Sequence, residues 1–195
     1  MPLLERIVKW CSERPSWGMY AKLFVLAYAF LLRLPSEALP VTLGQHSGPC
    51  SLFLEGDKIV LQLARRKNRP LGSRLTRGCW CKETMSTCPV HVLGPMFQRG
   101  KHGDMLFPGV SASKALVALR SILKKLGVDS AEDFRTHDFR RGHTQDLVDS
   151  GAPLYAILAA GEWKSPAFLA YVDAHKLEYD AVLQAHVDES DSEAE

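Results

Sequence analysis

The apolar positions of the chain recur mostly at helical spacing. The run LFVLAYAFLL lies between Lys22 and Arg33 and predicts a buried core helix over residues 20–33. A second apolar series with a stop at Gly127 predicts a helix over residues 112–126; its members are Leu116, Leu119, Ile122, Leu123 and Leu126. Further helices are expected at residues 2–13, 91–97, 138–150, 153–161, 166–172 and 175–187.

Two short segments have the pattern of strands instead. The β-branched and apolar sequence KIVLQLARR, residues 58–66, lies between turn residues and predicts a strand. The sequence SRLTR, residues 73–77, is expected to return beside it as a basic β-hairpin, and residues 41–56 predict a loop with a short strand. The expected fold is therefore mostly α with a small antiparallel β-sheet (α+β), in one domain over residues 1–187. A disordered acidic tail is expected at residues 188–195.

The composition agrees with a folded domain of ordinary size. The 195 residues are 46% apolar and 24% charged, which is typical of globular proteins. The longest apolar run has ten residues, whereas a membrane-spanning helix needs about twenty. The start, MPLLERIVKW, lacks the pattern of a secretory signal. The five cysteines are therefore expected to be free thiols or metal ligands in a reducing compartment.

The charges are distributed unevenly along the chain. Residues 58–82 carry eight Lys or Arg and no acid, whereas residues 173–195 carry eight acids against Lys176 alone. This asymmetry indicates a surface that binds a polyanion and a solvated acidic tail. A basic face can also be merely solvated, so charge alone leaves a nucleic-acid partner open.

A group of polar residues suggests phosphate chemistry. His137 and Arg140 share one face of a predicted helix, where imidazole and guanidinium can bind the oxygens of one phosphate. An isolated pair of this kind can equally be a surface contact. The chain also supplies an indole donor at Trp163, a phenol at Tyr171, and Arg33 at the end of the apolar helix, where a charge must reach water or serve a site.

With Lys67 at the tip of the predicted hairpin, the order of these residues resembles that of the tyrosine recombinases, the phage-integrase type of site-specific DNA recombinases. The resemblance is closest to the Crypton-like enzymes of eukaryotic, especially fungal, transposable elements, and it covers residues 20–187. The matching catalytic positions are Arg33, Lys67, His137, Arg140, Trp163 and Tyr171. Glu37 follows Arg33 by four residues rather than the usual three, and the interval from Trp163 to Tyr171 is one residue shorter than in most bacterial and phage enzymes.

The resemblance implies a mechanism of DNA cleavage and rejoining. The two arginines would neutralise the non-bridging phosphate oxygens, and the histidine and tryptophan would donate hydrogen bonds. Tyr171 would attack the phosphorus to give a 3′-phosphotyrosine, and Lys67 would protonate the leaving 5′ oxygen. Arg65, Arg66 and Arg69 compete with Lys67 for that role. No cofactor is expected for catalysis.

The resemblance also implies double-stranded DNA as the partner, a homo-oligomer (dimer or tetramer) on DNA, and a nuclear location in a eukaryote. The separate N-terminal core-binding domain of the family would be absent. Residues expected to contact DNA are Arg65, Arg66, Arg69, Arg74, Arg77, Arg141, His143 and Lys164. Two other interpretations are a catalytically silent DNA-binding or assembly module with the same fold, and a type IB topoisomerase.

A compact segment rich in cysteine, GCWCKETMSTCPVH, follows the predicted hairpin. Three thiols and an imidazole can form a tetrahedral site for structural zinc, and the candidate ligands are Cys79, Cys81, Cys88 and His91. The spacing is not a common zinc-finger pattern, so a loop of buried thiols is the alternative. With a metal, the segment would clamp the base of the hairpin.

Overall fold

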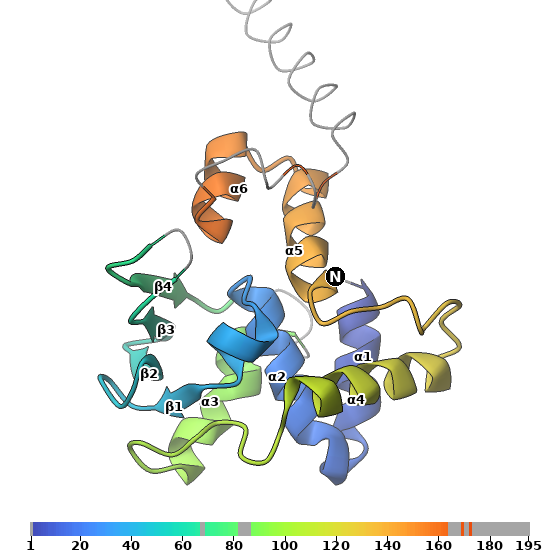
Figure 1. Ribbon diagram of the computed structural model, residues 1–195, viewed down its shortest axis with the longest axis horizontal. Helices are drawn as coiled ribbons and strands as arrows, with labels where there is room; N and C mark the ends of the chain where they lie inside the picture. Colours follow the sequence, from blue (N-terminus) through green and yellow to red (C-terminus); the bar gives the residue numbers. More distant parts are fainter. Residues whose placement is uncertain (1, 67–68, 82–86, 164–168, 170–171, 173–195) are drawn as a thin grey trace, which may run out of the picture.

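A buried helix, α2 (Gly18–Ala29), lies at the centre of the fold in the computed structural model, which describes residues 2–66, 69–81, 87–163, 169 and 172. From Leu23 to Ala29 every side chain of α2 is buried, because the segment is apolar on all sides. Four helices pack on it: α1 (Pro2–Ser12), α3 (Pro89–Arg99), α4 (Ala112–Lys125) and α5 (Asp138–Asp149). Figure 1 shows this arrangement, with the sheet to one side of α2.

The sheet has four strands in the described residues, in the order β1 (Val41–Leu43), β2 (Cys50–Glu55), β3 (Lys58–Leu63) and β4 (Ser73–Arg77). The predicted hairpin is confirmed as the antiparallel pair β3–β4, with Leu61 opposite Leu75. The expectation of a wholly antiparallel sheet was wrong, because β1 runs parallel to β2. Left-handed backbone at Gly44 (φ 101°) and His46 (φ 55°) turns the connection so that β2 begins beside β1.

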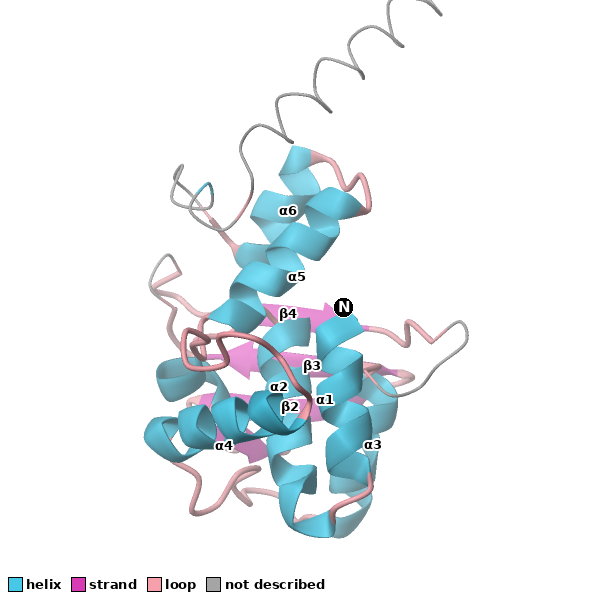
Figure 2. Ribbon diagram, turned by 90° about the vertical axis from the view of Figure 1, so that its right-hand side faces the viewer, coloured by secondary structure: helices cyan, strands magenta, loops and turns pink. Residues whose placement is uncertain are grey.

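Two helices form the upper part of the molecule in Figure 1. Helix α5 packs on α2, and α6 (Leu154–Gly161) packs on α5. A small apolar cluster joins these two helices to the end of α2; its buried members are Leu31, Val148, Ile157 and Trp163. Figure 2 shows α5 and α6 together on the same side, with the strands behind the helices.

The helices expected at residues 2–13, 91–97, 112–126, 138–150 and 153–161 are confirmed, and the fold is α+β. The helix expected over residues 20–33 ends at Ala29, because Leu31 adopts left-handed backbone (φ 50°) and Arg33 is extended. A short 3₁₀ turn, η1 (Pro15–Trp17), precedes α2, and a π-helical turn, η2 (Leu34–Ala38), follows it.

The helix expected at residues 175–187 and the acidic tail lie outside the described residues, as does most of the helix expected at residues 166–172. In the part of the chain that is described, no helix is long and apolar enough to cross a membrane.

Candidate functional site

The C-terminal end of α2 is capped by backbone hydrogen bonds. The amide of Leu31 donates to the carbonyl of Tyr28 (3.1 Å), and the amide of Leu32 donates to the carbonyl of Ala27 (2.9 Å). This is the pattern of a Schellman motif, in which a left-handed residue ends the helix. The residue in the left-handed position here is leucine rather than glycine. The carbonyls at this helix end point out of the helix and need donors from elsewhere.

Three arginines from distant segments supply those donors. Nε of Arg77 donates to the carbonyl of Ala29 over 2.7 Å. The carbonyl of Leu31 accepts from Nη2 of Arg66 (2.9 Å) and from Nη1 of Arg140 (2.7 Å). Guanidinium groups are favourable here because a helix C-terminus carries partial negative charge. The end of α2 is therefore the point at which the hairpin and α5 meet.

Arg66 also lies between two carboxylates. Its side chain is only 3% exposed; Nε is 3.2 Å from Oε1 of Glu37, and Nη1 is 2.8 Å from Oε2 of Glu162. Glu162 ends α6 in left-handed backbone (φ 51°), accepts a hydrogen bond from Ser73 and lies 3.5 Å from Nε of Arg69. This network ties η2, the hairpin and the end of α6 to one another.

Arg33 is held by the same carboxylate of Glu37. Nη1 of Arg33 lies 3.1 Å from Oε1, and the backbone amide of Arg33 donates to Oε2 over 2.9 Å. The four-residue spacing fits this contact because η2 is a π-helical turn, in which the amide of Ala38 returns to the carbonyl of Arg33 (3.3 Å). The side chain of Arg33 remains 33% exposed, so it can meet a ligand.

His137, Arg140 and Trp163 lie close to this end of α2. Arg140 is 2% exposed; its Nη2 donates to the carbonyl of Gly161 (3.0 Å), and its guanidinium carbon lies 4.6 Å from the centre of the Trp163 ring. His137 immediately precedes α5. Burial and the positive charges of Arg140 and Arg33 lower the pKa of the His137 imidazole. The shift favours the neutral form of the ring, which has one N–H donor.

The structure thus brings together four of the six expected catalytic residues, namely Arg33, His137, Arg140 and Trp163. Lys67 and Tyr171 lie outside the described residues, and so does Lys164. No family model, no curated protein and no solved structure matches the chain. The arrangement can bind an anion: two guanidinium groups and a neutral imidazole lie at the junction of α2, α5 and α6.

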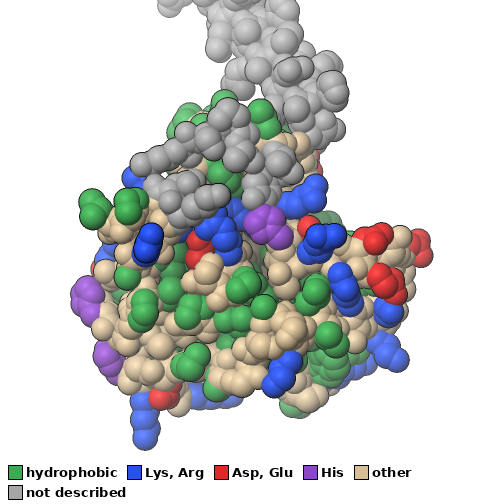
Figure 3. Space-filling view, viewed as in Figure 1, with side chains coloured by type: hydrophobic (Ala, Val, Ile, Leu, Met, Phe, Trp, Pro, Cys, Tyr) green, Lys and Arg blue, Asp and Glu red, His purple; other side chains and the backbone are tan. Residues whose placement is uncertain are grey.

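The arginines expected to contact DNA fall into two groups. Arg65, Arg69, Arg74 and Arg141 are exposed and can reach a polyanion, although Nη2 of Arg74 also lies 2.6 Å from both carboxylate oxygens of Glu55. Arg66 and Arg77 instead turn inward to the end of α2. Figure 3 shows Lys and Arg side chains spread over one face of the molecule.

His143 was expected on a DNA-facing surface, but the structure places it among aromatic residues. Its ring stacks on Tyr28 (centroids 4.5 Å apart), and Nδ1 donates to the carbonyl of Tyr28 over 2.6 Å. The ring of Trp80 is T-shaped to the His143 ring, with centroids 6.2 Å apart. Burial lowers the pKa of His143 to about 4 even though the Tyr28 carbonyl opposes the shift. This residue therefore packs α5 on α2.

The four candidate metal ligands come together. Their ligand atoms all lie within 4.8 Å of one another. Nδ1 of His91 is 3.7 Å, 3.2 Å and 3.3 Å from the sulfur atoms of Cys79, Cys81 and Cys88, and the sulfur atoms of Cys88 and Cys79 are 3.7 Å apart. Burial alone would raise the pKa of Cys88, but hydrogen bonds from His91 and neighbouring backbone lower it to about 6. This cluster could bind a metal ion.

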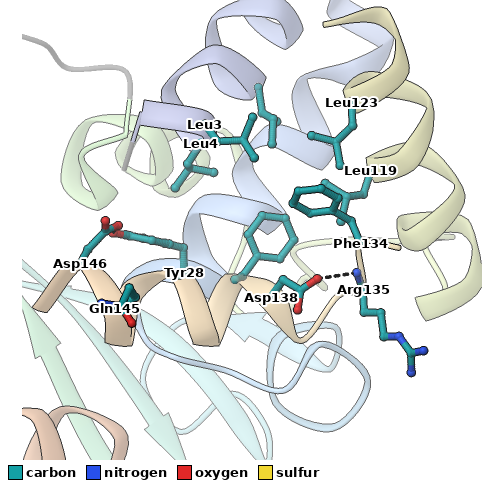
Figure 4. A pocket seen from close by; sticks show the side chains of 13 residues that line it. Leu3, Leu4, Tyr28, Leu119, Leu123, Phe134, Arg135, Asp138, Gln145 and Asp146 are labelled. Carbon is teal, nitrogen blue, oxygen red and sulfur yellow. Dashed lines mark hydrogen bonds between the residues drawn. The ribbon is translucent and has the colours of Figure 1, made fainter. Parts of the chain in front are cut away.

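A separate cavity of about 240 Å³ lies between α1, α2, α4 and α5. Figure 4 shows Leu3, Leu119 and Phe134 in its wall, with Asp138 accepting from the backbone amide of Arg135 (2.7 Å). The cavity is lined by the face of α5 that carries Phe139. Arg140 lies on another face of that helix, so the cavity is not part of the arginine cluster.

Sequence reasoning did not identify the roles of Arg66 and Glu162. Arg66 was one of several cations in a basic segment, and Glu162 was only the residue between Gly161 and Trp163. Their pairing joins positions 96 residues apart. No periodicity or local motif signals such a contact.

Proposed function

We propose that this chain is a DNA breaking and rejoining domain of the tyrosine recombinase type, with double-stranded DNA as its substrate and a homo-oligomer as its working form. The observation that carries the proposal is the convergence of Arg33, His137, Arg140 and Trp163 at the end of α2. These residues come from three segments far apart in the sequence. Their order is that of the recombinase catalytic residues, and a phosphodiester needs such donors.

Three residues of this group, Arg33, Arg140 and His137, have distinct parts in the proposed reaction. The exposed guanidinium of Arg33 binds a non-bridging oxygen of the scissile phosphate directly. Arg140 is fixed by the carbonyls of Leu31 and Gly161, so it supplies a preorganised positive charge behind the phosphate. The neutral imidazole of His137 donates one hydrogen bond as negative charge builds on the oxygens.

Two residues outside the described part of the chain, Tyr171 and Lys67, would carry out the covalent chemistry. The hydroxyl of Tyr171 gives up its proton to water as its oxygen bonds to phosphorus, and the P–O bond to the 5′ oxygen breaks; that leaving oxygen takes a proton from Lys67. The products are a 3′-phosphotyrosine and a free 5′-hydroxyl, and the reverse reaction rejoins the strand. Lys67 directly follows Arg66 in the sequence. The buried Arg66–Glu162 pair therefore fixes the chain one residue before the proposed general acid.

The proposal is tested with a library of synthetic nicked duplexes whose sequence is randomised around the nick. Loss of the short fragment beyond the nick prevents rejoining, so an active enzyme accumulates a covalent, protease-sensitive protein–DNA adduct. The matched control is Tyr171→Phe, which removes one oxygen atom. Adduct formation that depends on Tyr171 supports the proposal. An adduct that survives in Tyr171→Phe excludes Tyr171 as the nucleophile.

A catalytically silent DNA-binding module is the second candidate. The observation that favours it is the 2% exposure of Arg140, whose donors already meet two backbone carbonyls. The same assay separates the two functions. The silent module would retain the duplexes in a filter-binding assay, with an affinity that falls steeply with salt, and would form no adduct.

We also propose that the metal bound by the cysteine cluster is zinc in a structural role. A tetrahedral site with Zn–S bonds of ~2.3 Å and a Zn–N bond of ~2.0 Å has ligand–ligand edges of about 3.5–3.8 Å. The four distances quoted above, 3.2–3.7 Å, are close to these values. Elemental analysis of the purified chain should find one zinc per chain, and none in the variant Cys81→Ser.

A further inference from the structure

The metal cluster connects two secondary-structure elements. Cys79 and Cys81 follow β4, whereas Cys88 and His91 lie at the start of α3. A metal held by these four residues therefore joins the end of the hairpin to α3. The metal could affect more distant parts of the fold only through other residues of the Cys79–Cys81 segment, and Trp80 is the residue between the two cysteines.

Trp80 lies between two of the ligands in the sequence Cys79-Trp80-Cys81. A metal bound by Cys79 and Cys81 would fix the backbone of Trp80 on both sides, and the partly buried side chain of Trp80 packs against the main core. The indole Nε1 is buried, and it has no acceptor among the residues that the structure describes. Burying an N–H group without an acceptor is unfavourable. Something other than a hydrogen bond must therefore hold the indole in this position. A metal ion bound by both Cys79 and Cys81 would do so, because it would restrain the backbone of Trp80 between them.

The Trp80 ring contacts α5. The Trp80 and His143 rings are T-shaped to one another, with centroids 6.2 Å apart and an interplanar angle of 89°, and Trp80, His143 and Tyr28 line one open groove. His143 in turn joins α5 to α2 through its stacking and its hydrogen bond with Tyr28. The same helix carries Arg140, and His137 directly precedes it.

We propose that metal binding acts as a clip on α5: the ion fixes the Cys79-Trp80-Cys81 segment, which holds Trp80 against His143 and so stabilises the helix that carries the arginine site. This inference rests on the proposed zinc site, and it does not depend on the proposed DNA cleavage. It assigns Trp80 a positioning role, because Trp80 reaches the site only through His143 and α5.

Hydrogen–deuterium exchange of the full chain tests the clip. Removing zinc with a chelator should speed exchange in residues 73–99, which hold the ligands, and also about tenfold or more in residues 138–149. Strand β2 should change little, and added zinc should restore the original pattern. If chelation affects residues 73–99 but leaves residues 138–149 unchanged, zinc binds but the clip does not exist. If the chain binds no zinc, both proposals fail.

Two variants separate the clip from a general effect of metal on folding. Trp80→Leu keeps an apolar side chain and all four ligands, so it should retain one zinc per chain while residues 138–149 exchange as in the metal-free protein. Tyr155→Leu is the matched control, because Tyr155 is 76% exposed on α6. Should Trp80→Leu fail to fold, His143→Ala removes the contact from the other side. In that variant, exchange in residues 138–149 should no longer respond to zinc, and a response of wild-type size would overturn the inference.

Discussion

Arg66 donates a hydrogen bond to Glu162 over 2.8 Å, although 96 residues separate them in the sequence. The same guanidinium contacts Glu37 and the carbonyl of Leu31, so one buried side chain connects the hairpin to the ends of α2 and α6. A buried charge is tolerated only when its partners compensate for the loss of water. The two carboxylates do so here. If Arg66 is removed, each of them loses a buried cationic partner, which destabilises the folded state.

The first prediction concerns this network. Arg66→Met should lower the free energy of unfolding by about 3–5 kcal/mol, because it leaves Glu37 and Glu162 without their buried cation. Arg65→Met, at the exposed neighbouring position, should change it by less than ~0.5 kcal/mol. Urea denaturation of both variants measures the difference. Equal stabilities would show that the buried contacts of Arg66 contribute nothing.

A second prediction follows from the absence of a side chain at Gly161. A Cβ atom there would lie 1.9 Å from the ring of Trp163, so Gly161→Ala must displace the indole from its position over Arg140. We expect a loss of about 1–3 kcal/mol in stability and a changed near-UV circular dichroism spectrum. Gly142→Ala is the control, since a Cβ at that position of α5 meets nothing within 4 Å. It should be neutral or stabilising by up to ~1 kcal/mol, and a reversed order of the two variants would contradict the packing of Trp163.

A third prediction concerns acid sensitivity. Burial, aided by the charge of Arg77, lowers the pKa of His143 from 6.5 to about 4, against the Tyr28 carbonyl and Asp146. Between these two pH values the unfolded chain binds a proton that the folded chain does not, so stability rises with pH and is lost as pH falls towards 4. The full contribution is about 3 kcal/mol, at ~1.4 kcal/mol for each pKa unit.

Urea denaturation at pH 4.5 and at pH 7 measures this contribution. His143→Phe keeps the stacking on Tyr28 but removes the titrating group, so its stability should differ less between the two pH values than that of the wild type. Carboxylates that titrate in the same range affect both proteins alike and cancel in the comparison. An unchanged pH dependence in His143→Phe would show that His143 is not the group responsible.

The fourth prediction concerns the proposed cleavage. Arg33→Ala should slow adduct formation on saturating nicked duplex by about 10²–10³-fold, as expected when one donor to a developing oxyanion is removed. Glu37 keeps Arg66 as a partner in this variant, so the fold should persist. Lys125→Ala, an exposed cation at the end of α4, is the control and should react at the wild-type rate. Single-turnover rates give the comparison, and equal rates for Arg33→Ala and wild type would exclude Arg33 from the reaction.

Much of the secondary structure could be predicted because it depends on neighbouring residues. The apolar series ending at Gly127 marked α4, and the β-branched run after Gly56 marked β3. The end of α2 could not be predicted, because an apolar run gives no sign that Leu31 will adopt left-handed backbone. The parallel pairing of β1 with β2 was missed for a similar reason, since it depends on the path of the connecting loop.

For the candidate site, the sequence by itself determined which chemical groups are available and their order along the chain. It also determined the set of thiols and the imidazole that can bind a metal. Only the tertiary structure decided which cations face solvent and which face inward. The carbonyl of Leu31 takes its donors from positions 35 and 109 residues away, and such partners are set by how helices and strands pack. Arg66 and Arg65 are adjacent and chemically identical in the sequence, yet one is buried between two carboxylates and the other is exposed, because only Arg66 meets Glu37, Glu162 and the carbonyl of Leu31 in the folded chain.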